Sequence, residues 1–347
     1  MERILSYRDA VREATAQEMA RDPSVIVLGM GVTDFEGVYG TTQGLAQQFG
    51  GDRVFDTPVA EEGMTGIAIG AALAGLRPVH VHIRMDFLLL AMNQLVNVAA
   101  KARYMYGGAV SVPLVVRAIV GRSWGQGAQH SQGLQSLFMH IPGLRVVAPT
   151  TPYDAKGCLI RAIRDDDPVI FIEHRMLHMH RGHVPDTAYE VPFGKARVLA
   201  PGRDITLVGI SYMAVEALRA RALLAESGID AEVIDPVSLS PLDSDTIVGS
   251  AARTGALLVV DNGWTNCGAS AEIVARTAER LQGQTPIRLQ RIGFAPVTCP
   301  TAKNLESLFY PDAPRIAAAA HMLVRGVAAS WPSASRAAEL VEFRGPF

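Results

Sequence analysis

Two adjacent carboxylates, Glu61 and Glu62, follow the run RVFDTPV and precede the stretch GMTGIAIGAALAG. The run predicts a strand, and the ligands of open parallel sheets gather at the carboxyl ends of strands. A carboxylate carried into a packed interface there is partly desolvated, so its proton affinity rises and it can share a proton with a heterocycle nitrogen. Acids also complement the positive end of a helix dipole. The residues alone leave both roles open.

A histidine, His130, lies in the glycine-rich string GQGAQHSQG, after a predicted strand and before a predicted helix. Because the imidazole titrates close to neutral pH, His130 is well placed for acid–base chemistry at the end of that strand. The structural alternative is that His130 caps the following helix. Both interpretations stay open.

A third polar group lies in HVHIRMDF, where His80 and His82 alternate along a predicted strand and Arg84 and Phe87 follow its end. Phe87 can stack on a planar ring. The fork of Arg84 suits bidentate pairing with a carboxylate. The alternative for Arg84 is a salt bridge to Asp86 or to a partner subunit.

The segment HRMLHMHRGH (174–183) concentrates histidines, but their spacing fits no HExxH helix and no cysteine is close in sequence. We interpret it as a polar loop at a site entrance, with metal binding as the alternative. The sequence contains no GxxxxGK[ST] phosphate loop, no GxGxxG between a strand and a helix, and no GxSxG elbow. Kinase-type, Rossmann-type and serine-hydrolase functions therefore lose their main support.

The elements that must position these residues alternate between β-branched runs and helical patterns. Predicted strands lie at 24–31, 77–83, 112–121, 144–150 and 167–174, and predicted helices lie at 6–22, 63–75, 86–106 and 151–167. A second series follows, with strands at 205–211, 231–237, 256–262 and 287–293. This rhythm indicates an α/β fold with two parallel-sheet domains. We predict domains at 1–185 and 204–327, a linker at 186–203 and a tail at 328–347.

Composition narrows the function classes. The chain has 347 residues, a formal net charge of -2 and 49% hydrophobic residues, so no electrostatic footprint points to nucleic acid or to a membrane surface. Three widely separated cysteines favour a reducing compartment. The N-terminus lacks the apolar core of a secretory signal, and no apolar run is long enough to span a membrane. We predict a cytoplasmic protein.

Several separated strings together resemble the beta subunit of thiamine-diphosphate-dependent 2-oxo acid dehydrogenases. They are DTPVAEEGMTGIAIGAALAGLRPV, FLLLAMNQLVNVAAKARYMYGG, GAQHSQ and PGLRVVAPTTPYDAKGCLIRAIRDDDPVIFIE. The similarity continues through AEVIDPVSLSPLD and DNGWTNCG. The resemblance implies a pyrimidine-binding domain followed by a transketolase C-terminal-type domain.

The resemblance also implies partners. The family's alpha subunit supplies the site for the diphosphate and magnesium through a Gly-Asp-Gly motif, and this chain has no such motif. The chain is therefore expected to hold half of a thiamine diphosphate site in an alpha2beta2 assembly. The implied activity is oxidative decarboxylation of a 2-oxo acid, with acyl transfer to the lipoyl group of an acyltransferase core.

Motif by motif, the resemblance implies roles for individual residues. Counting from Pro58, the family's cofactor-activating glutamate falls on Glu61, which binds the aminopyrimidine ring nitrogen. Phe87 matches the aromatic residue packed against the pyrimidine. His130 matches the active-site histidine near the reacting carbon and the lipoyl group, and Gln132 is assigned to the substrate with it.

A loop near the end of the first domain matches a metal site of some members. The backbone oxygens of Ala162, Asp165 and Asp167 correspond to those that hold a structural potassium ion there.

One segment departs from the family. Pyruvate-type members read Glu-Phe-Met-Thr-Phe where this chain reads VHIRM at 81–85. The segment lies by the family's cofactor pocket, so we assign His82 to the cofactor and Arg84 to the substrate. The exchange of two aromatic residues for two basic ones predicts a substrate more polar or acidic than pyruvate, or an acyl acceptor other than lipoyl.

Two other functions remain as alternatives. One is half of a split transketolase-like or deoxyxylulose-phosphate-synthase-like enzyme, which transfers a two-carbon unit and needs no lipoyl carrier. The other is a non-catalytic scaffold subunit, against which the presence of both Glu61 and His130 argues.

Overall fold

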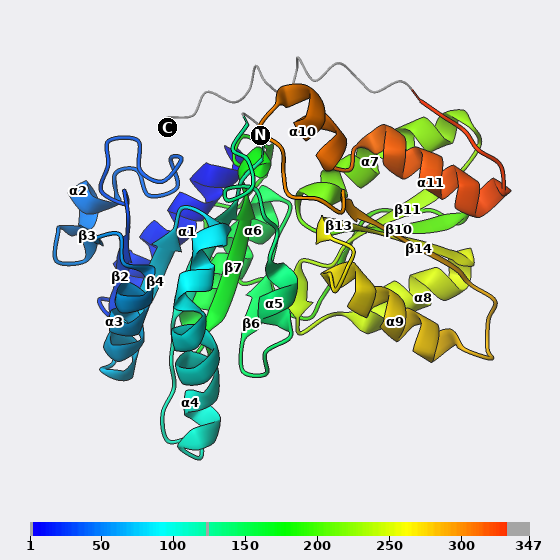
Figure 1. Cartoon of the computed structure of the whole chain (residues 1–347). Helices are drawn as coiled ribbons and strands as arrows, with labels where there is room; N and C mark the ends of the chain where they lie inside the picture. Colours follow the sequence, from blue (N-terminus) through cyan, green and yellow to red (C-terminus); the bar gives the residue numbers. More distant parts are fainter. Residues whose placement is uncertain (1–2, 123–124, 332–347) are drawn as a thin grey trace. The chain divides into compact units, whose positions relative to one another are not determined.

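The chain forms two compact units (Figure 1). The computed structural model describes residues 3–122 and 125–331. Of these, residues 3–122 and 137–193 make up the first unit, and residues 125–136 and 194–331 make up the second. Most of the predicted tail, residues 332–347, lies outside the described residues.

The first unit is built on a parallel sheet. Its strands follow the order β6–β7–β5–β4–β2–β3, and each neighbouring pair is parallel. Runs of Val and Ile are buried on both faces of these strands, as is typical of a sheet covered by helices on each side. The strands are β2 (Val25–Gly29), β3 (Val54–Asp56), β4 (Arg77–His82), β5 (Val115–Val120), β6 (Arg145–Val147) and β7 (Val169–His174).

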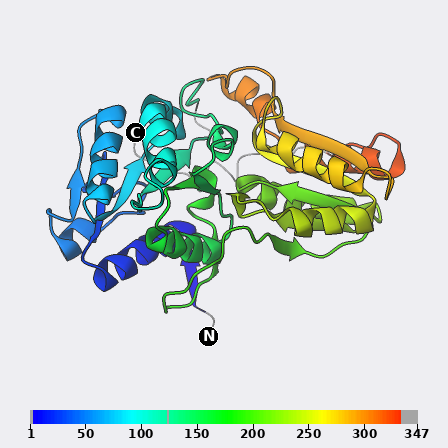
Figure 2. The same ribbon diagram turned by 90° about the horizontal axis from the view of Figure 1, so that it is seen from below.

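Helices cover both faces of this sheet (Figure 2). Helices α1 (Tyr7–Arg21) and α6 (Pro152–Arg164) pack on each other on one side. On the other side, α3 (Glu61–Leu73) packs against η1 (Met85–Ala91) and η2 (Gln94–Ala99). Shorter elements complete the unit: α2 (Leu45–Phe49), α4 (Ala100–Met105) and η3 (Arg175–Leu177).

The prediction of one continuous helix over 86–106 is wrong in its hydrogen bonding. The segment runs from a 3₁₀ turn, η1, through a π-helical turn, η2, into the short α-helix α4. Periodic apolar residues reveal that such a segment packs on a sheet, but they do not fix the spacing of its backbone hydrogen bonds. Turns of the π type are frequently found at functional sites in proteins.

Four short strands of the described residues were not predicted, among them β12 (Ser238–Ser240), which follows the predicted strand at 231–237. Strands β1 (Ile4–Ser6) and β8 (Arg181–His183) form an antiparallel pair, and the second of them comes from the histidine-rich segment. Strand β9 (Arg197–Ala200), inside the predicted linker, pairs antiparallel with β11 of the second unit. The prolines and glycines around β9 are typical of turns, so the sequence pattern predicted a linker where a four-residue edge strand lies.

The second unit has a sheet of its own with strand order β14–β13–β10–β11–β9. Helices α7 and α11 lie on one face of this sheet, and α8 and α9 lie on the other (Figure 1). Its further strands are β10 (Ile205–Gly209), β11 (Ala231–Asp235), β13 (Ala256–Trp264) and β14 (Arg288–Phe294). Strand β12 (Ser238–Ser240) belongs to this unit but is not part of this sheet. Its helices are α7 (Tyr212–Glu226), α8 (Ser244–Thr254), α9 (Ala269–Leu281), α10 (Lys303–Phe309) and α11 (Ala313–Arg325).

Within the described ranges, no helix is both long and apolar enough to cross a membrane.

Candidate active site

Helix α3 places the two adjacent acids in its first turn. Glu61 is its first residue, and the preceding residue, Ala60, provides no side-chain cap. The backbone N–H groups of this turn therefore favour negative charge in the acids. Glu61 is half-buried, whereas Glu62 is exposed and its Oε1 accepts a hydrogen bond of 3.0 Å from Gln94 Nε2. The second acid thus has a neighbour of its own on η2.

The glycines of α3 leave one face of this helix bare. A Cβ atom at Gly63 or Gly70 would meet nothing within 4 Å, and one at Gly66 would meet only Gln94 Cγ, at 3.8 Å, among the described residues. Each glycine makes the helix less stable by about 0.8–1 kcal/mol relative to alanine. No close contact within the described part of the chain offsets this cost, which is consistent with a partner surface.

Two buried histidines on β4 lie behind α3. His80 and His82 point to the same face because residues two apart in a strand do so, and their rings meet edge to face at 4.3 Å. His82 Nε2 lies 3.5 Å from Thr65 Oγ1 of α3, and His80 Nδ1 lies 3.3 Å from the Leu28 carbonyl oxygen. Burial lowers the pKa of His80 to about 4 and holds the pKa of His82 well below its ordinary value. Both rings are therefore neutral at pH 7.

These histidines predict a loss of stability in acid. An unfolded histidine binds a proton below about pH 6.5, whereas the buried rings resist it, so the free energy of unfolding falls as the pH drops below that value. Each ring contributes a slope of up to about 1.4 kcal/mol per pH unit. We expect His82→Phe to flatten this slope in chemical denaturation measured between pH 7 and pH 4.5. His140→Gln, a change at an exposed histidine, is the control, and an unchanged slope in His82→Phe would contradict the account.

Phe87 lies on η1, directly after β4, and is half-buried. Because η1 packs on α3, the same cluster of elements carries Phe87 and Glu61. An aminopyrimidine ring requires a carboxylate for its ring nitrogen and an apolar side chain for its face. The residues of the first unit therefore fit this group. His82 is buried under α3 and touches Thr65, so its observed contact is with the helix.

Arg84 precedes η1 and points to a tyrosine that the sequence did not single out. Its Nη1 donates to the hydroxyl of Tyr39 and, at 2.9 Å, to the Ile83 carbonyl. A second guanidinium, that of Arg175 on η3, lies over the same tyrosine ring. The sequence signal that could have revealed Arg175 is an arginine placed immediately after the end of a buried strand, VIFIEH.

A buried ion pair joins two neighbouring strands of this sheet, β5 and β7. The Nε and Nη2 atoms of Arg117 donate to the two carboxylate oxygens of Glu173 at 2.7 and 3.0 Å, and both side chains are 0% exposed. Arg117 Nη2 also donates to Thr41 Oγ1 at 2.7 Å. His178 Nε2 lies 3.3 Å from Glu173 Oε2. Burial would raise the pKa of Glu173, but the attraction of Arg117 and the hydrogen bonds from His178 and Arg117 outweigh it and lower that pKa to about 2.

The loop of His130 belongs to the second unit by its contacts, although the predicted limits place it in the first domain. A Cβ atom at Gly133 would lie 1.7 Å from the Asn262 carbonyl oxygen on β13, so only glycine fits there. Gln135, the first residue of α5 (Gln135–Met139), donates at 2.7 Å to the buried carboxylate of Asp261 on the same strand. These contacts anchor the loop, in which His130 is half-buried.

The predicted potassium loop already binds a cationic side chain. Arg77 Nη1 donates to the carbonyl oxygens of Ile163 and Asp165, at 3.0 Å each. The Ala162 carbonyl accepts the Asp165 N–H at 3.3 Å. Carbonyl oxygens are the right ligand type for potassium, but the guanidinium charge opposes a second cation at the same oxygens. The residues of this loop therefore fit a potassium ion less well than Glu61 and Phe87 fit an aminopyrimidine.

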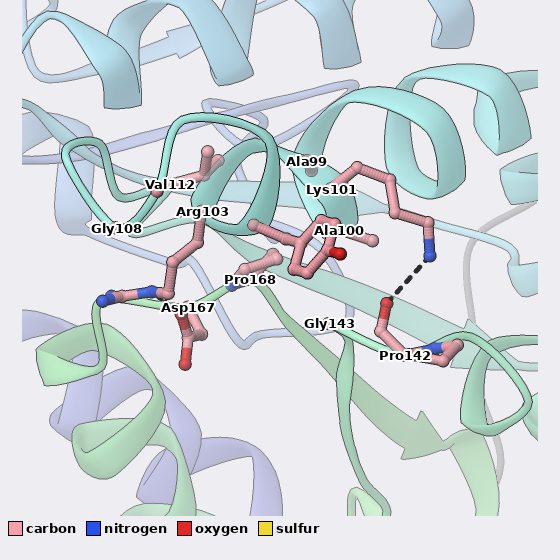
Figure 3. Close-up of a pocket in the computed structure, with 12 residues that line it drawn as sticks. Ala99, Ala100, Lys101, Arg103, Gly108, Val112, Pro142, Gly143, Asp167 and Pro168 are labelled. Atoms are coloured by element: carbon pink, nitrogen blue, oxygen red, sulfur yellow. Dashed lines mark hydrogen bonds and ion pairs between the residues drawn. The ribbon is translucent and has the colours of Figure 1, made fainter.

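Asp167 lines a cavity of about 860 Å³ beside α4. Its carboxylate accepts from Arg103 Nε at 2.5 Å and from Arg145 Nη2 at 2.8 Å, so its side chain is fully committed. Across the cavity, Lys101 Nζ donates to the Pro142 carbonyl at 3.1 Å (Figure 3). The lining consists mainly of small and apolar residues from α4 and the loops after it.

The histidine-rich segment is not the polar loop that we predicted, because much of it is regular secondary structure; its place at a site entrance stays a prediction. His174 and His178 are buried, and His174 Nδ1 accepts the Met176 N–H at 3.2 Å. In the residues that the structure describes, no three His, Cys, Asp or Glu side chains are grouped closely enough to hold a metal ion. The segment instead continues β7 into η3 and then supplies β8.

Comparison with known proteins identifies the class. Residues 4–180 match the family described as transketolase, pyrimidine binding domain, and residues 194–316 match transketolase, C-terminal domain. A solved structure described as a split gene transketolase, inactive beta4 tetramer, shares the fold with a TM-score of 0.76 at 23% identity, over 92% of this chain and 98% of that chain. The chain thus belongs to the transketolase-like proteins that join these two domains, and the predicted fold class is confirmed.

Closer relatives narrow the family. The chain is 44% identical over 336 residues to the beta subunit of acetoin:2,6-dichlorophenolindophenol oxidoreductase from Cupriavidus necator, covering 94% of this chain and 99% of that one. It is 41% identical over 308 residues to the pyruvate dehydrogenase E1 beta subunit of Rickettsia felis, covering 89% and 94%. The chain is therefore a member of the family of beta subunits of pyruvate and acetoin dehydrogenase E1 components, which are thiamine-diphosphate-dependent oxidoreductases.

Proposed function

We propose that this chain is the beta half of an enzyme that decarboxylates a 2-oxo acid oxidatively and passes the acyl group to a lipoyl carrier. The observation that carries the proposal is the placement of Glu61 as the first residue of α3, on a helix that packs against the element bearing Phe87. A carboxylate at an uncapped helix start, next to an aromatic side chain, suits one edge and one face of an aminopyrimidine.

Each residue then has a defined task. Glu61 holds a proton at the ring nitrogen of the pyrimidine, and Phe87 packs against the ring and keeps water from it. His82 ties β4 to α3 through Thr65 and so fixes the direction of the helix that carries Glu61. His130 and Gln132 handle protons and the acyl acceptor near the reacting carbon. Bound thiamine diphosphate supplies the nucleophilic carbon and takes up the electrons left by carbon dioxide.

The remaining parts of the site come from partners. An alpha subunit holds the diphosphate and magnesium, because this chain lacks the Gly-Asp-Gly motif. The bare glycine face of α3 supports close packing of a partner subunit in an alpha2beta2 assembly. A potassium ion at the carbonyl oxygens of Ala162, Asp165 and Asp167 would have to tolerate Arg77. We place the protein in the cytoplasm, which agrees with its free cysteines.

The half-site predicts that the chain alone does not turn over substrate. With thiamine diphosphate and magnesium, we expect no decarboxylation by the chain alone and clear turnover after addition of an alpha subunit that carries the Gly-Asp-Gly motif. Reduction of 2,6-dichlorophenolindophenol, with a panel of 2-oxo acids and acetoin, measures this. The alpha subunit alone is the control. Turnover by the pure chain, or none by the reconstituted pair on any of these compounds, would contradict the proposal.

A further inference from the structure

The loop that carries His130 is held on its N-terminal side by α10 and by the segment before that helix. The N–H of Gly125 donates to Glu306 Oε2 on α10 at 3.3 Å. A Cβ atom at Gly127 would lie 2.7 Å from Thr301 Cγ2, so the backbone of the loop lies directly against Thr301. The Gly127 carbonyl in turn accepts the His130 N–H at 3.4 Å. The start of the loop is therefore fixed by contacts within the second unit.

On the other side of His130, the side chain of Gln135 ties the loop to β13. Gln135 Nε2 donates to Asp261 Oδ1 at 2.7 Å, and both side chains are buried. Two glycines leave room for this amide. A Cβ atom at Gly133 would lie 3.1 Å from Gln135 Oε1, and one at Gly263 would lie 3.0 Å from Gln135 Nε2. Close packing and a hydrogen bond together fix the orientation of the amide.

The carboxylate of Asp261 has a second donor on another element. Its Oδ2 accepts the backbone N–H of Ser270, in the first turn of α9, at 2.8 Å. Burial raises the pKa of Asp261, against the hydrogen bonds from Ser270 and Gln135 and the charge of Arg291. A buried carboxylate is costly, and an apolar pair of similar volume would join the loop to β13 without that cost. The polar pair adds direction, because a hydrogen bond weakens steeply when its angle is wrong.

We propose that Gln135 and Asp261 are positioning residues for His130, and that the hydrogen bond between their side chains sets the loop conformation in which His130 acts. This inference rests on the proposed function, in which His130 handles protons and the acyl acceptor. A catalytic group displaced by about 1 Å can lower a rate by about 10²-fold. The contact between Gln135 and Asp261 therefore acts on kcat, through His130.

A double-mutant cycle on the enzyme reconstituted with its alpha subunit tests this role. Gln135→Leu removes the donor and keeps a side chain of similar size, and we expect it to lower kcat by about 10- to 100-fold. His130→Ala removes the group that Gln135 positions. Since the first change acts through the second residue, the double variant should be slower than His130→Ala by no more than about twofold.

An exchange of donor and acceptor gives a readout that a mere loss of stability would not produce. Gln135→Glu alone places two carboxylates side by side, so it should lower kcat about as much as Gln135→Leu. With Asp261→Asn added, the amide at position 261 donates to the carboxylate at 135 and still accepts the Ser270 N–H. We expect this exchange variant to recover most of the lost kcat, because it restores the hydrogen bond in the same shape.

Thermal midpoints measured for every variant separate positioning from unfolding. Ser250→Ala is the control, because it removes a buried hydroxyl that donates to Glu232 elsewhere in the second unit. This change should lower the thermal midpoint while kcat stays at the wild-type value. A loss of kcat in Gln135→Leu that exceeds the loss in a control of equal thermal midpoint supports the positioning role.

The outcomes distinguish this inference from the proposed function. Losses that multiply in the double variant of Gln135 and His130 would overturn the inference and leave the proposed function standing. An exchange variant that folds like the wild type but stays as slow as Gln135→Glu would do the same. An undiminished kcat in His130→Ala would instead overturn the role of His130 in the proposed function, and this inference with it.

Discussion

Glu61→Gln is expected to lower kcat of the reconstituted alpha–beta enzyme by about 10²- to 10⁴-fold, the range typical of a lost acid–base group. Glutamine has the shape of the carboxylate but cannot hold a proton at the pyrimidine nitrogen. Because Glu61 is half-buried at an uncapped helix start, the change leaves the packing of α3 intact. The loss should therefore appear in kcat, with the folded state and the assembly with the alpha subunit preserved.

The neighbouring acid provides a matched control. Glu62 lies in the same turn, carries the same charge and accepts a hydrogen bond from Gln94. Glu62→Gln should change kcat by less than about threefold, because an exposed charge at a helix start contributes only about 0.3–1 kcal/mol. Steady-state kinetics on both variants decide the matter. Equal losses would show that charge at the helix start, and not a specific proton position, is what the two acids provide.

Much of the fold could be predicted because buried parallel strands differ clearly in composition from their surroundings. The apolar runs that become β5 and β7 need no partner information to be recognised, since both faces of a central strand are covered. The start of α3 could also be placed close to the two acids. The contacts between side chains of different elements at the site depend on the direction in which each side chain points. The pattern of apolar and polar residues along the sequence does not contain this information.

The missed features share a physical cause. The helix turns of η1 and η2, the strand β9 and the attachment of the His130 loop to β13 all depend on contacts between segments far apart in the chain. Gly133 shows this clearly, because its need for glycine comes from a backbone oxygen on Asn262. The sequence of a glycine-rich loop does not show which of its glycines the fold requires.

The sequence also contains a signal for a buried ion pair in the first unit. The runs VVRAIV and VIFIEH each carry a charged residue inside an apolar strand, and these strands are neighbours in the sheet. A charge in a buried strand requires a partner, because an unpaired ion in the interior is strongly unfavourable. Opposite charges in two such strands predict the Arg117–Glu173 pair, which the structure shows fully buried.

This pair carries the second large prediction. Arg117→Leu is expected to destabilise the protein by about 3–5 kcal/mol, since it leaves Glu173 buried without its main partner. The thermal midpoint at pH 7 should fall on the order of 10 °C for a unit of this size, as measured by scanning calorimetry. The double variant Arg117→Leu with Glu173→Leu should recover a large part of the loss, because replacing both ions with apolar groups is often nearly neutral. A single variant as stable as the wild type would contradict the account.

The pH dependence distinguishes this mechanism from simple loss of packing. In the wild type, the pKa of Glu173 is depressed to about 2, so its contribution is complete above the ordinary carboxyl pKa of 4.5 and disappears as the pH falls from there towards 2. In Arg117→Leu, burial acts on Glu173 with only His178 left against it, so the pKa rises and the folded state binds a proton more readily than before. The acid-induced loss of stability between pH 4.5 and pH 2 should therefore shrink in the single variant. The part of this loss that comes from Glu173 should be absent from the double variant, whereas a cavity alone would lower the whole curve without changing its slope.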